Sequence, residues 1–528
     1  MTFKTISSST LNQIFIIMIL IISLLSFNGC STETSKTQNI YNLSGIVVTD
    51  EPHGVLSGVN ILNKGGTAAD AVVAAFFSMS VTYPVGAGIG SGGSCIIYDE
   101  KTKSSESLDF KNTLIDEASF IGIPGSVRGL AGMQARYGDL RWSQVVLPAE
   151  KLARFGHKVS RASANSYKNY SRIAGVQNFG KFLINDNPVQ EGQVVKQPEL
   201  ANTLSRIRMR GGGDLYFGES AKIFINKVDS LNINISNKTL NSIQPKWKLA
   251  KKVDSNSFNL YFANDDVSGG KISSSIILNL IKNNLYKNSN ELQRRHILIE
   301  ESNKSLNSQF YKKKLIKFNN YKINLNNHEN KILNPGFPNL SSWKNAGHDG
   351  STSIVAIDAN GQAVSCIFSM GSPFGSGKLL DDLGFAPGLA EDYRKINWLQ
   401  SGYDFTVPMI VTSKKGKISF VGASSGGPSS GSVLSSIFLE SIILDNSLKK
   451  SVKKPRLFSP GKPDELWYEE LISKKLLDEL KLKGHNLVES SKLSRVNVIK
   501  CNLNNVNGAN CNYFSDIRGY GIGFSGVK

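Results

Sequence analysis

The sequence predicts a layered α/β body, and two observations carry this prediction. Apolar residues at helical spacing alternate with short strand-like runs in the front of the chain, and strands followed by an apolar helix return in its last third. Strands that are grouped with helices before and after them favour packed layers over a closed barrel. The chain has 528 residues, of which 40% are hydrophobic and 20% charged. It is therefore long enough for a large core, and its composition excludes a disordered or collagen-like chain.

The first predicted elements are helices. Val55–Asn63 and Ala68–Tyr83 carry apolar residues at helical spacing. Lys64-Gly65-Gly66 separates them, and a glycine at this position can end the first helix. Two further helical stretches follow, one that ends at Tyr137 and one over Trp142–Phe155.

A glycine-rich loop joins the second helix to a predicted strand, Ser94–Asp99. Gly88, Gly90 and Gly93 in this loop match G-x-G-x-x-G, the fingerprint of dinucleotide sites. That fingerprint follows a strand and opens a helix, whereas this loop leaves a helix and opens a strand. The context argues against a nucleotide, and we expect no organic cofactor.

The middle of the chain is predicted to be less regular than its ends. Residues 228–345 are rich in Asn, Lys and Ser, which favours surface insertions around a few helices. Strand-like runs follow at Ile354–Asp358, Ala363–Ser369, Phe405–Thr412 and Lys417–Val421. A Gly/Ser-rich loop, Gly422–Gly431, then leads into an apolar helix, Ser432–Leu444.

The N-terminus is typical of an export signal. Lys4 precedes the apolar run Ile14–Phe27, which is short for a membrane span but suits the core of a signal peptide. The run ends shortly before Cys30, and a Ser/Thr/Lys-rich tether follows. This arrangement resembles a bacterial lipoprotein signal, with residues 1–29 removed, Cys30 lipidated and residues 30–43 as the tether. Plain secretion and an uncleaved anchor are the alternatives, and all three place the body outside the cytoplasm, in the periplasm.

The net charge of +19 raises the question of nucleic-acid binding. The lysines are spread through stretches such as Lys312–Lys317 and Lys449–Arg456, without a zinc spacing or an aromatic RNA-binding motif. We therefore expect no nucleic-acid partner. The six histidines show no metal-ligand spacing either, so no metal is predicted.

Five cysteines are too few for a disulfide framework in a chain of this length. Cys501 and Cys511 lie in a polar, Asn-rich segment, where they can form a disulfide in an oxidising compartment. Cys95 and Cys366 lie in apolar strand-like runs and are expected to be buried thiols.

Short motifs then follow one another in a fixed order along the chain. The front half contains Gly65–Val72 (GGTAADAV), the Gly-Ile-Gly-Ser-Gly-Gly loop at 88–93, Leu108–Phe110, Ile123–Ser126, Arg136–Gly138, Gln190–Gly192 and Gln197–Pro198. The back half contains Asp358–Ser365, Phe374–Gly377, Gly422–Gly427 and Asp516–Gly519. Together these blocks resemble the large and small subunits of γ-glutamyltranspeptidases, over roughly residues 44–225 and 348–528.

The resemblance implies an α+β N-terminal-nucleophile hydrolase fold, an αββα sandwich of two stacked sheets between helical layers. It also implies a precursor that cuts its own chain, so that residues 44–350 form a large-subunit region and 351–528 a small-subunit region. The family transfers or hydrolyses a γ-glutamyl group of small amides such as glutathione. The new N-terminal hydroxyl is the nucleophile, and its own α-amine can act as the base.

The nucleophile position departs from the family pattern of Thr, a small residue and His. Counting back from Gly361 without a gap places Ser351 at the nucleophile and Ser353 where the family has His. Thr352 is at the nucleophile position only if this chain has one residue fewer than the family pattern between the nucleophile and the turn at Gly361. Gly350 provides an unhindered peptide bond ahead of Ser351. The nucleophile can therefore be Ser351 or Thr352, and a third alternative is that neither residue has this role.

The substrate pocket also departs from the family. The family's carboxylate-binding Arg falls on Lys111, which keeps the charge but not the planar fork of a guanidinium. The family's Asn falls on Gly371, and its paired serines fall on Asp404 and Phe405. Asp382, with its neighbour Asp381, is the candidate for the acid that binds the glutamyl amine.

The loop Ser425–Gly427 is the remaining part of the implied site. The backbone N–H groups of Gly426 and Gly427 can stabilise a tetrahedral oxyanion, and Ser425 is expected to contact the substrate. A tight turn between strand and helix is the plainer explanation of the two glycines.

Three functions follow from these residues. The first is an extracytoplasmic γ-glutamyltranspeptidase-like amidohydrolase that acts on a small peptide or amino-acid amide. The second is a member that has lost catalysis and acts as a binding or structural protein. The third rests on Ser429, which fits G-x-S-x-G between a strand and a helix, with Asp464 and His485 in the order required for a serine hydrolase.

Overall fold

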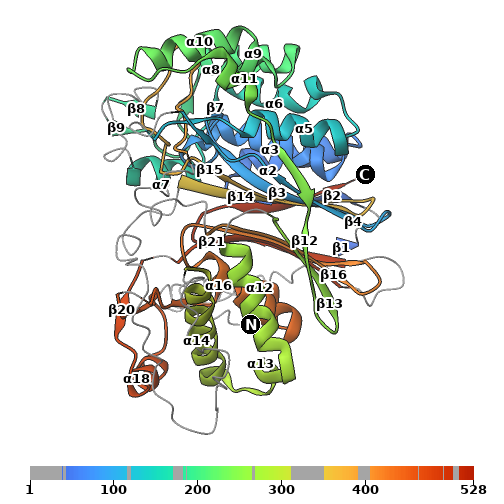
Figure 1. The fold of residues 1–528 in the computed structure, drawn as a ribbon, viewed down its shortest axis with the longest axis vertical. Helices are drawn as coiled ribbons and strands as arrows, with labels where there is room; N and C mark the ends of the chain where they lie inside the picture. The colour runs from blue at the N-terminus through green and yellow to red at the C-terminus, as the bar shows by residue number, and fades with distance from the viewer. Residues whose placement is uncertain are drawn as a thin grey trace, which may run out of the picture. The chain divides into compact units, whose positions relative to one another are not determined.

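Two seven-stranded sheets, both antiparallel, organise the protein (Figure 1). The computed structural model describes residues 38–39, 43–115, 120–170, 182–185, 187–264, 268–310, 350–390, 405–461, 463–491, 493–502 and 510–527. The first sheet has the order β11 (Lys246–Leu249), β4 (Ser104–Asp109), β3 (Gly92–Asp99), β15 (Gln362–Ser369), β14 (Ser351–Asp358), β2 (Leu43–Thr49) and β23 (Ile522–Val527). The second has the order β1 (Gln38–Asn39), β22 (Asn510–Ser515), β21 (Arg495–Asn502), β17 (Ile418–Ser425), β16 (Val407–Ser413), β13 (Phe258–Phe262) and β12 (Lys251–Asp254).

Strand β14 shows why the sheets stack. Its middle residues, 354–357, are apolar on both faces, since side chains alternate along a strand and both faces of this one are covered. Ile354 and Ala356 belong to the core under the first helical layer, whereas Val355 and Ile357 belong to the core between the sheets. The second sheet supplies the facing side chains of that central core, among them Ile410 of β16.

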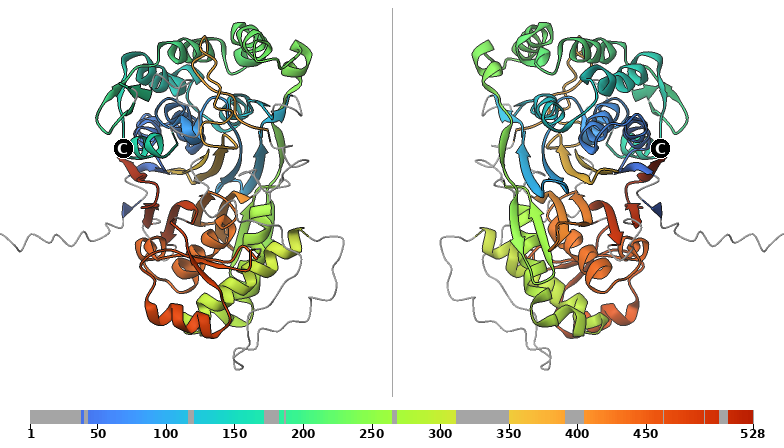
Figure 2. Two further views of the ribbon diagram at one scale, coloured as in Figure 1. Left: turned by 90° about the vertical axis from the view of Figure 1, so that its left-hand side faces the viewer. Right: turned by 90° about the vertical axis from the view of Figure 1, so that its right-hand side faces the viewer.

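Helices cover the outer face of each sheet (Figures 1 and 2). The first helical layer includes α2 (Pro52–Asn63), α3 (Ala68–Thr82), α5 (Ser126–Tyr137), α6 (Trp142–Phe155), α8 (Pro198–Arg210) and α10 (Glu219–Asp229). The second includes α12 (Ser268–Ile281), α14 (Glu291–Phe310), α16 (Ser430–Phe438) and α17 (Leu448–Lys453). The four layers confirm the predicted αββα sandwich.

Helix α3 lies at the centre of the first layer, and all 15 of its residues are buried. Thr67 and Asp70 form a capping box at its N-terminus. Two residues of the turn between β14 and β15 also bind this terminus, since Asp358 accepts from Ala68 N (3.0 Å) and Gln362 from Ala69 N (2.9 Å). Burial raises the pKa of Asp358 although backbone N–H groups oppose the shift. The Asp-x-x-Gly turn therefore fastens the helix layer to the sheet.

The middle of the chain differs from its prediction as a region of surface insertions. Its described part supplies an edge strand to the first sheet, β11, and two strands to the second, β12 and β13. It also supplies α12 and α14, which pack on the second sheet. Short strands with exposed polar faces, such as Lys251–Asp254, carry too weak a periodicity to be recognised from sequence.

The expectation of a free thiol at Cys95 and at Cys366 is wrong. The two residues face each other on β3 and β15 and form a disulfide, with Cα atoms 4.1 Å apart. Cys501 and Cys511 form a second disulfide between β21 and β22, as the sequence allowed. An apolar environment predicts burial of a cysteine but does not show whether its partner lies on the neighbouring strand.

The glycine-rich loop before β3 serves close backbone packing. A Cβ atom on Gly90 would lie 2.0 Å from the Ala386 carbonyl oxygen, and one on Gly93 would lie 2.1 Å from that of Ile367. These contacts leave room only for glycine, which explains the loop without a phosphate ligand.

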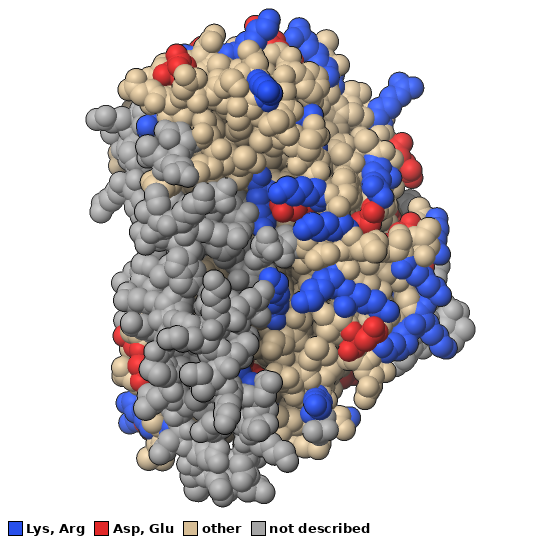
Figure 3. All heavy atoms as spheres, in the orientation of Figure 1, with Lys and Arg blue, Asp and Glu red and all other residues tan. Residues whose placement is uncertain are grey.

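Where the face drawn in Figure 3 is coloured, Lys and Arg side chains are visible over the half that carries β4, β12 and β13, with acidic side chains among them. Lys252 and Lys414 pair with Asp254 of β12, at 3.6 and 3.0 Å. The expected absence of a nucleic-acid partner stays a prediction.

The export signal, the tether up to Thr37, Cys30, Lys312–Lys317 and Asp404 lie outside the described residues. Among the helices that are described, none combines the length and the apolar character needed to span a bilayer.

Candidate functional site

Ser351 is the first residue of strand β14 and is 4% exposed. It pairs with Ser369 on β15. By the alternation seen along β14, Ser351 and Ser353 face the second sheet. Asn497 of β21 donates to Ser353 Oγ (2.7 Å), in agreement with this orientation. No hydrogen bond of the Ser351 hydroxyl is found within the described part of the chain.

Thr352, the alternative nucleophile, is completely buried. Its hydroxyl donates to Asp50 Oδ2 at 2.8 Å. Burial raises the pKa of Asp50, while Arg495, Thr352 and Asn497 act in the opposite direction. The carboxyl group thus holds Thr352, the second residue of β14, in place.

A buried network surrounds the start of β14. Arg495 Nη2 donates to the Ser351 carbonyl oxygen (2.8 Å) and Nη1 donates to the Tyr83 hydroxyl (2.9 Å). The Arg495 guanidinium also lies 3.8 Å from Asp50 Oδ2. Asn497 Nδ2 donates to Asp50 Oδ1 at 2.9 Å. Because the network joins both sheets, it fixes the backbone of residues 351–353 between them.

The carbonyl group of Gly350 accepts two hydrogen bonds. Met370 N donates at 2.8 Å and Ser369 Oγ at 3.2 Å. Two donors on one carbonyl oxygen draw electron density from its carbon and stabilise negative charge that develops on the oxygen. The peptide bond between Gly350 and Ser351 is therefore polarised where the sequence predicts cleavage.

The candidate oxyanion loop follows β17, which extends to Ser425 and so shortens the loop expected over Gly422–Gly431. Gly426 and Gly427 adopt φ angles of +104° and +96°, which favour glycine strongly. Ser494 Oγ donates to the Gly426 carbonyl oxygen at 3.2 Å. The next residue of this segment, Arg495, binds the Ser351 carbonyl oxygen, so the structure links the loop to the nucleophile strand.

The structure also links the segments of Lys111 and Gly371. Asn112 Nδ2 donates to the Leu389 carbonyl oxygen (3.3 Å), and Leu389 N donates to that of Met370 (2.8 Å). Gly371 has a φ of +80° and packs against Leu389. Lys111 and Gly371 therefore lie on segments that meet at Leu389, next to the strand that pairs with Ser351.

Of the other candidate substrate residues, Asp382 and Phe405 contact other elements, whereas Ser425 pairs with Arg495, whose side chain binds the Ser351 carbonyl oxygen. Asp382 is 61% exposed in its side chain and pairs with Lys227 of α10 at 3.0 Å. Phe405 is completely buried in the core under the second sheet. Ser425 is also buried, and its hydroxyl has no hydrogen-bond partner among the described residues. All three assignments stay predictions.

Ser429 and His485 of the serine-hydrolase alternative contact other side chains in the described part of the chain, whereas Asp464 lies beside the segment of His485, since Asn486 Nδ2 donates to the Asp464 carbonyl oxygen at 3.4 Å. Ser429 Oγ lies 2.5 Å from Ser494 Oγ. His485 Nε2 faces His296 and Glu300, at 3.1 and 3.8 Å, instead of Ser429.

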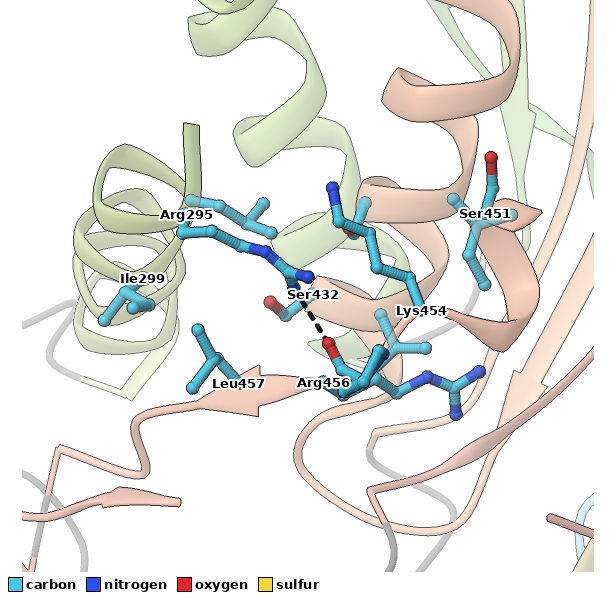
Figure 4. Close-up of a pocket in the computed structure, with 12 residues that line it drawn as sticks. Arg295, Ile299, Ser432, Ser451, Lys454, Arg456 and Leu457 are labelled. Carbon is cyan, nitrogen blue, oxygen red and sulfur yellow. Dashed lines mark hydrogen bonds between the residues drawn. The ribbon is translucent and has the colours of Figure 1, made fainter. Parts of the chain in front are cut away.

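A small pocket lies between α14, α16 and the segment after α17 (Figure 4). Arg295 extends across it and donates from Nη1 to the Pro455 carbonyl oxygen at 2.9 Å. Residues of the nucleophile strand do not line this pocket.

Sequence reasoning missed Asp50, Arg495, Asn497 and Ser369. The first three carry no local motif, because their role depends on contacts between strands that are more than 140 residues apart in the chain. Ser369 had a detectable signal, since it ends the strand that the turn at Gly361 pairs with β14.

Residues 55–523 match the model of the family described as gamma-glutamyltranspeptidase. The chain belongs to this family. Its members are N-terminal-nucleophile amidohydrolases, and the protein is an enzyme of this γ-glutamyltransferase and glutathione hydrolase type.

The chain is similar to curated proteins and to solved structures over most of its length. The glutathione hydrolase proenzyme of Pseudomonas aeruginosa is 27% identical, over 91% of this chain and 94% of its own length. Scoloptoxin SSD14 of Scolopendra dehaani is 25% identical over 84% of this chain and 86% of its own length. The crystal structure of a cephalosporin acylase from Bacillus halodurans has the same fold, with a TM-score of 0.77. The similarity covers 94% of this chain and 99% of the acylase chain, at 18% sequence identity.

Proposed function

We propose that this protein is an exported γ-glutamyl amidohydrolase and transferase that activates itself by cutting the Gly350–Ser351 bond. The observation that carries the proposal is the Gly350 carbonyl oxygen, which accepts from Met370 N and Ser369 Oγ. Ser351 follows this carbonyl group directly, and no hydrogen bond within the described residues holds its hydroxyl. The Thr352 hydroxyl, in contrast, is bound to Asp50.

The cleavage begins with attack of Ser351 Oγ on the Gly350 carbonyl carbon. The hydroxyl proton moves to the departing backbone nitrogen as the C–N bond breaks, and the Gly350 acyl group becomes an ester on Oγ. Water then hydrolyses this ester to a Gly350 carboxylate and a free Ser351. The two donors on the Gly350 oxygen stabilise the tetrahedral intermediate of the first step.

The mature enzyme uses the groups that cleavage releases. The Ser351 α-amine, with a pKa near 8, removes the proton of its own hydroxyl as that hydroxyl attacks the substrate amide. The amine of the substrate leaves with this proton, and the γ-glutamyl ester is passed to water or to an amino acid. Gly426 and Gly427 present backbone N–H groups for the second oxyanion.

The proposed substrates are glutathione-like amides with a small acyl group. The glutathione hydrolase name of the Pseudomonas aeruginosa relative supports this class. Lys111 is the cation for the substrate carboxylate, and it binds less tightly than the bidentate fork of an Arg. We therefore expect slow turnover of simple γ-glutamyl substrates.

Export is part of the proposal. The signal-like run before Cys30 supports lipidation of that residue and a periplasmic, membrane-anchored location. Two disulfides in the described part of the chain support an oxidising compartment. An intact-mass spectrum of membrane-extracted protein tests lipidation at Cys30.

The decisive experiment is a reducing denaturing gel of aged, purified protein, followed by N-terminal sequencing of the smaller fragment. We expect a fragment that begins Ser-Thr-Ser in the wild type and none in Ser351→Ala. Ser365→Ala is the matched control, since this buried serine lies on β15 and its hydroxyl binds the Gly422 carbonyl oxygen of the second sheet. Hydrolysis of glutathione is measured on the same samples.

Two results would overturn the proposal in different ways. A fragment that begins at Thr352 would assign the nucleophile to that residue. A single intact chain without amidase activity would identify a member that has lost catalysis, the second function considered from the sequence.

A further inference from the structure

We propose that His296, Glu300 and His485 form a binding site for a divalent metal ion of the zinc type, which joins helix α14 to the segment after α18 (Lys474–Leu482). His296 and Glu300 are four residues apart on α14 and lie on the same face. His485 reaches them from the turn between α18 and β20 (Leu487–Glu489).

The distances between the donor atoms fit one metal ion. His296 Nδ1 lies 3.1 Å from His485 Nε2, which lies 3.8 Å from Glu300 Oε1. All three donor atoms are within 4.8 Å of one another. Tetrahedral zinc with bonds of about 2.0–2.1 Å separates its ligand atoms by about 3.4 Å. An ion between the three groups therefore needs small side-chain shifts and no change in the backbone.

The donor set selects the class of metal. Two imidazole nitrogens and one carboxylate oxygen suit zinc and neighbouring transition metals, whereas calcium and magnesium prefer oxygen donors. Three protein ligands leave the fourth tetrahedral position to a water molecule.

Burial makes the site more than a surface contact. His296 is 9% exposed, and Glu300 and His485 are each 4% exposed. Buried donor atoms bind a metal ion with little competition from water, since few water molecules reach them. A divalent ion at this position accepts a lone pair from each imidazole nitrogen and from the carboxylate oxygen.

The site joins two elements of the chain. Arg295 and Ile299 of α14 face the pocket of Figure 4, whereas His296 and Glu300 contact His485. The segment that His485 belongs to is held by a small apolar cluster, in which only Ile299, Leu457, Leu466 and Leu480 are buried among the described residues. A metal cross-link adds to this limited packing, and it lies outside the nucleophile strand.

Sequence spacing could not show this site. His296 and His485 are 189 residues apart, and the pattern His-x-x-x-Glu within one helix is too short to stand out. The prediction that the chain carries no metal site therefore rested on local spacing alone.

The experiment measures zinc binding by the full-length purified protein after removal of metals with a chelator. We expect about one equivalent of Zn²⁺ per chain by elemental analysis and a melting temperature that rises by a few degrees with Zn²⁺ but not with Mg²⁺. His296→Gln, Glu300→Gln and His485→Gln should each weaken zinc binding by about 10-fold or more, since each removes one ligand. His157→Gln is the matched control, because His157 is 4% exposed and lies outside the cluster.

A second measurement on the wild type does not depend on the folding of any variant. Co²⁺ in place of Zn²⁺ should give the intense visible absorption bands of tetrahedral coordination. Absence of stoichiometric zinc, octahedral cobalt spectra, or equal zinc affinity in all four variants would each overturn the proposal. In those cases the three side chains form a hydrogen-bonded cluster without a metal.

Discussion

The carbonyl oxygen of Gly350 is the residue-scale feature on which self-cleavage depends. Ser369 Oγ provides one of its two hydrogen bonds. We expect Ser369→Ala to slow cleavage by about 10²-fold, since loss of one oxyanion donor costs about 10²–10³ in rate. The fragment that begins at Ser351 is followed over time on reducing gels.

Ser365→Ala again serves as the control, because Ser365 lies on the same strand and its hydroxyl contacts Gly422 instead. Equal cleavage rates in Ser369→Ala and the wild type would show that Met370 N alone suffices. Slower cleavage in Ser365→Ala as well would point to a general loss of sheet packing.

The sequence could mark Ser351 as a candidate nucleophile but could not show its environment. Gly361 and the Asp-x-x-Gly turn set the register of the two strands, and a turn is local information. Asp50 and Arg495 reach the same place from other strands, so their roles depend on tertiary contacts that no spacing records. Asp382 and Phe405 lie on segments whose path depends on packing, so their assignment to the substrate pocket stays a prediction.

At the scale of elements, long apolar patterns were predicted well and short polar ones were not. Helix α6 has the predicted bounds, Trp142–Phe155, and β3 differs from its prediction by two residues at one end. Strand β17 continues four residues past its predicted end, to Ser425, because pairing with β16 and β21 holds small residues in the sheet. Edge strands such as β12 gain their order from a neighbour and lack a clear pattern of their own.

The N-terminus of α3 gives a prediction at this scale. Thr67 Oγ accepts from Asp70 N at 3.2 Å and donates to the Tyr137 carbonyl oxygen at 2.9 Å. Thr67→Ala should lower the free energy of unfolding by about 1–2 kcal/mol, the usual cost of a lost N-cap. Chemical denaturation measures it.

Ser236→Ala is the comparison for this prediction. Ser236 caps the six-residue helix α11 (Asn237–Ser242), and its hydroxyl lies in an exposed position. A smaller loss is expected there, because water replaces the missing hydrogen bond. If Thr67→Ala lowers the free energy of unfolding by no more than Ser236→Ala does, the buried cap at Thr67 is not important for stability.

For the whole molecule, a buried histidine makes stability depend on pH. Burial, with a contribution from His53, lowers the pKa of His157 from 6.5 to about 4. The folded protein keeps His157 neutral, whereas the unfolded chain binds a proton below pH 6.5. Stability is therefore unaffected above pH 6.5 and falls as the pH drops from 6.5 to about 4, by on the order of 3 kcal/mol.

Melting temperatures of the wild type and His157→Gln between pH 4 and 7.5 test this effect. The advantage of the wild type over the variant should shrink as the pH falls through this window. Parallel curves would show that His157 does not carry the titration.

The disulfide between β3 and β15 has a consequence for the mature enzyme. Cys95 precedes the proposed cut at Gly350–Ser351 and Cys366 follows it. A self-cleaved molecule is then a heterodimer whose two chains are covalently tethered, so neither subunit is lost on dilution or denaturation while the medium stays oxidising. Without reductant such a molecule migrates near the mass of the uncut precursor, and only a reduced sample reveals that its backbone is open.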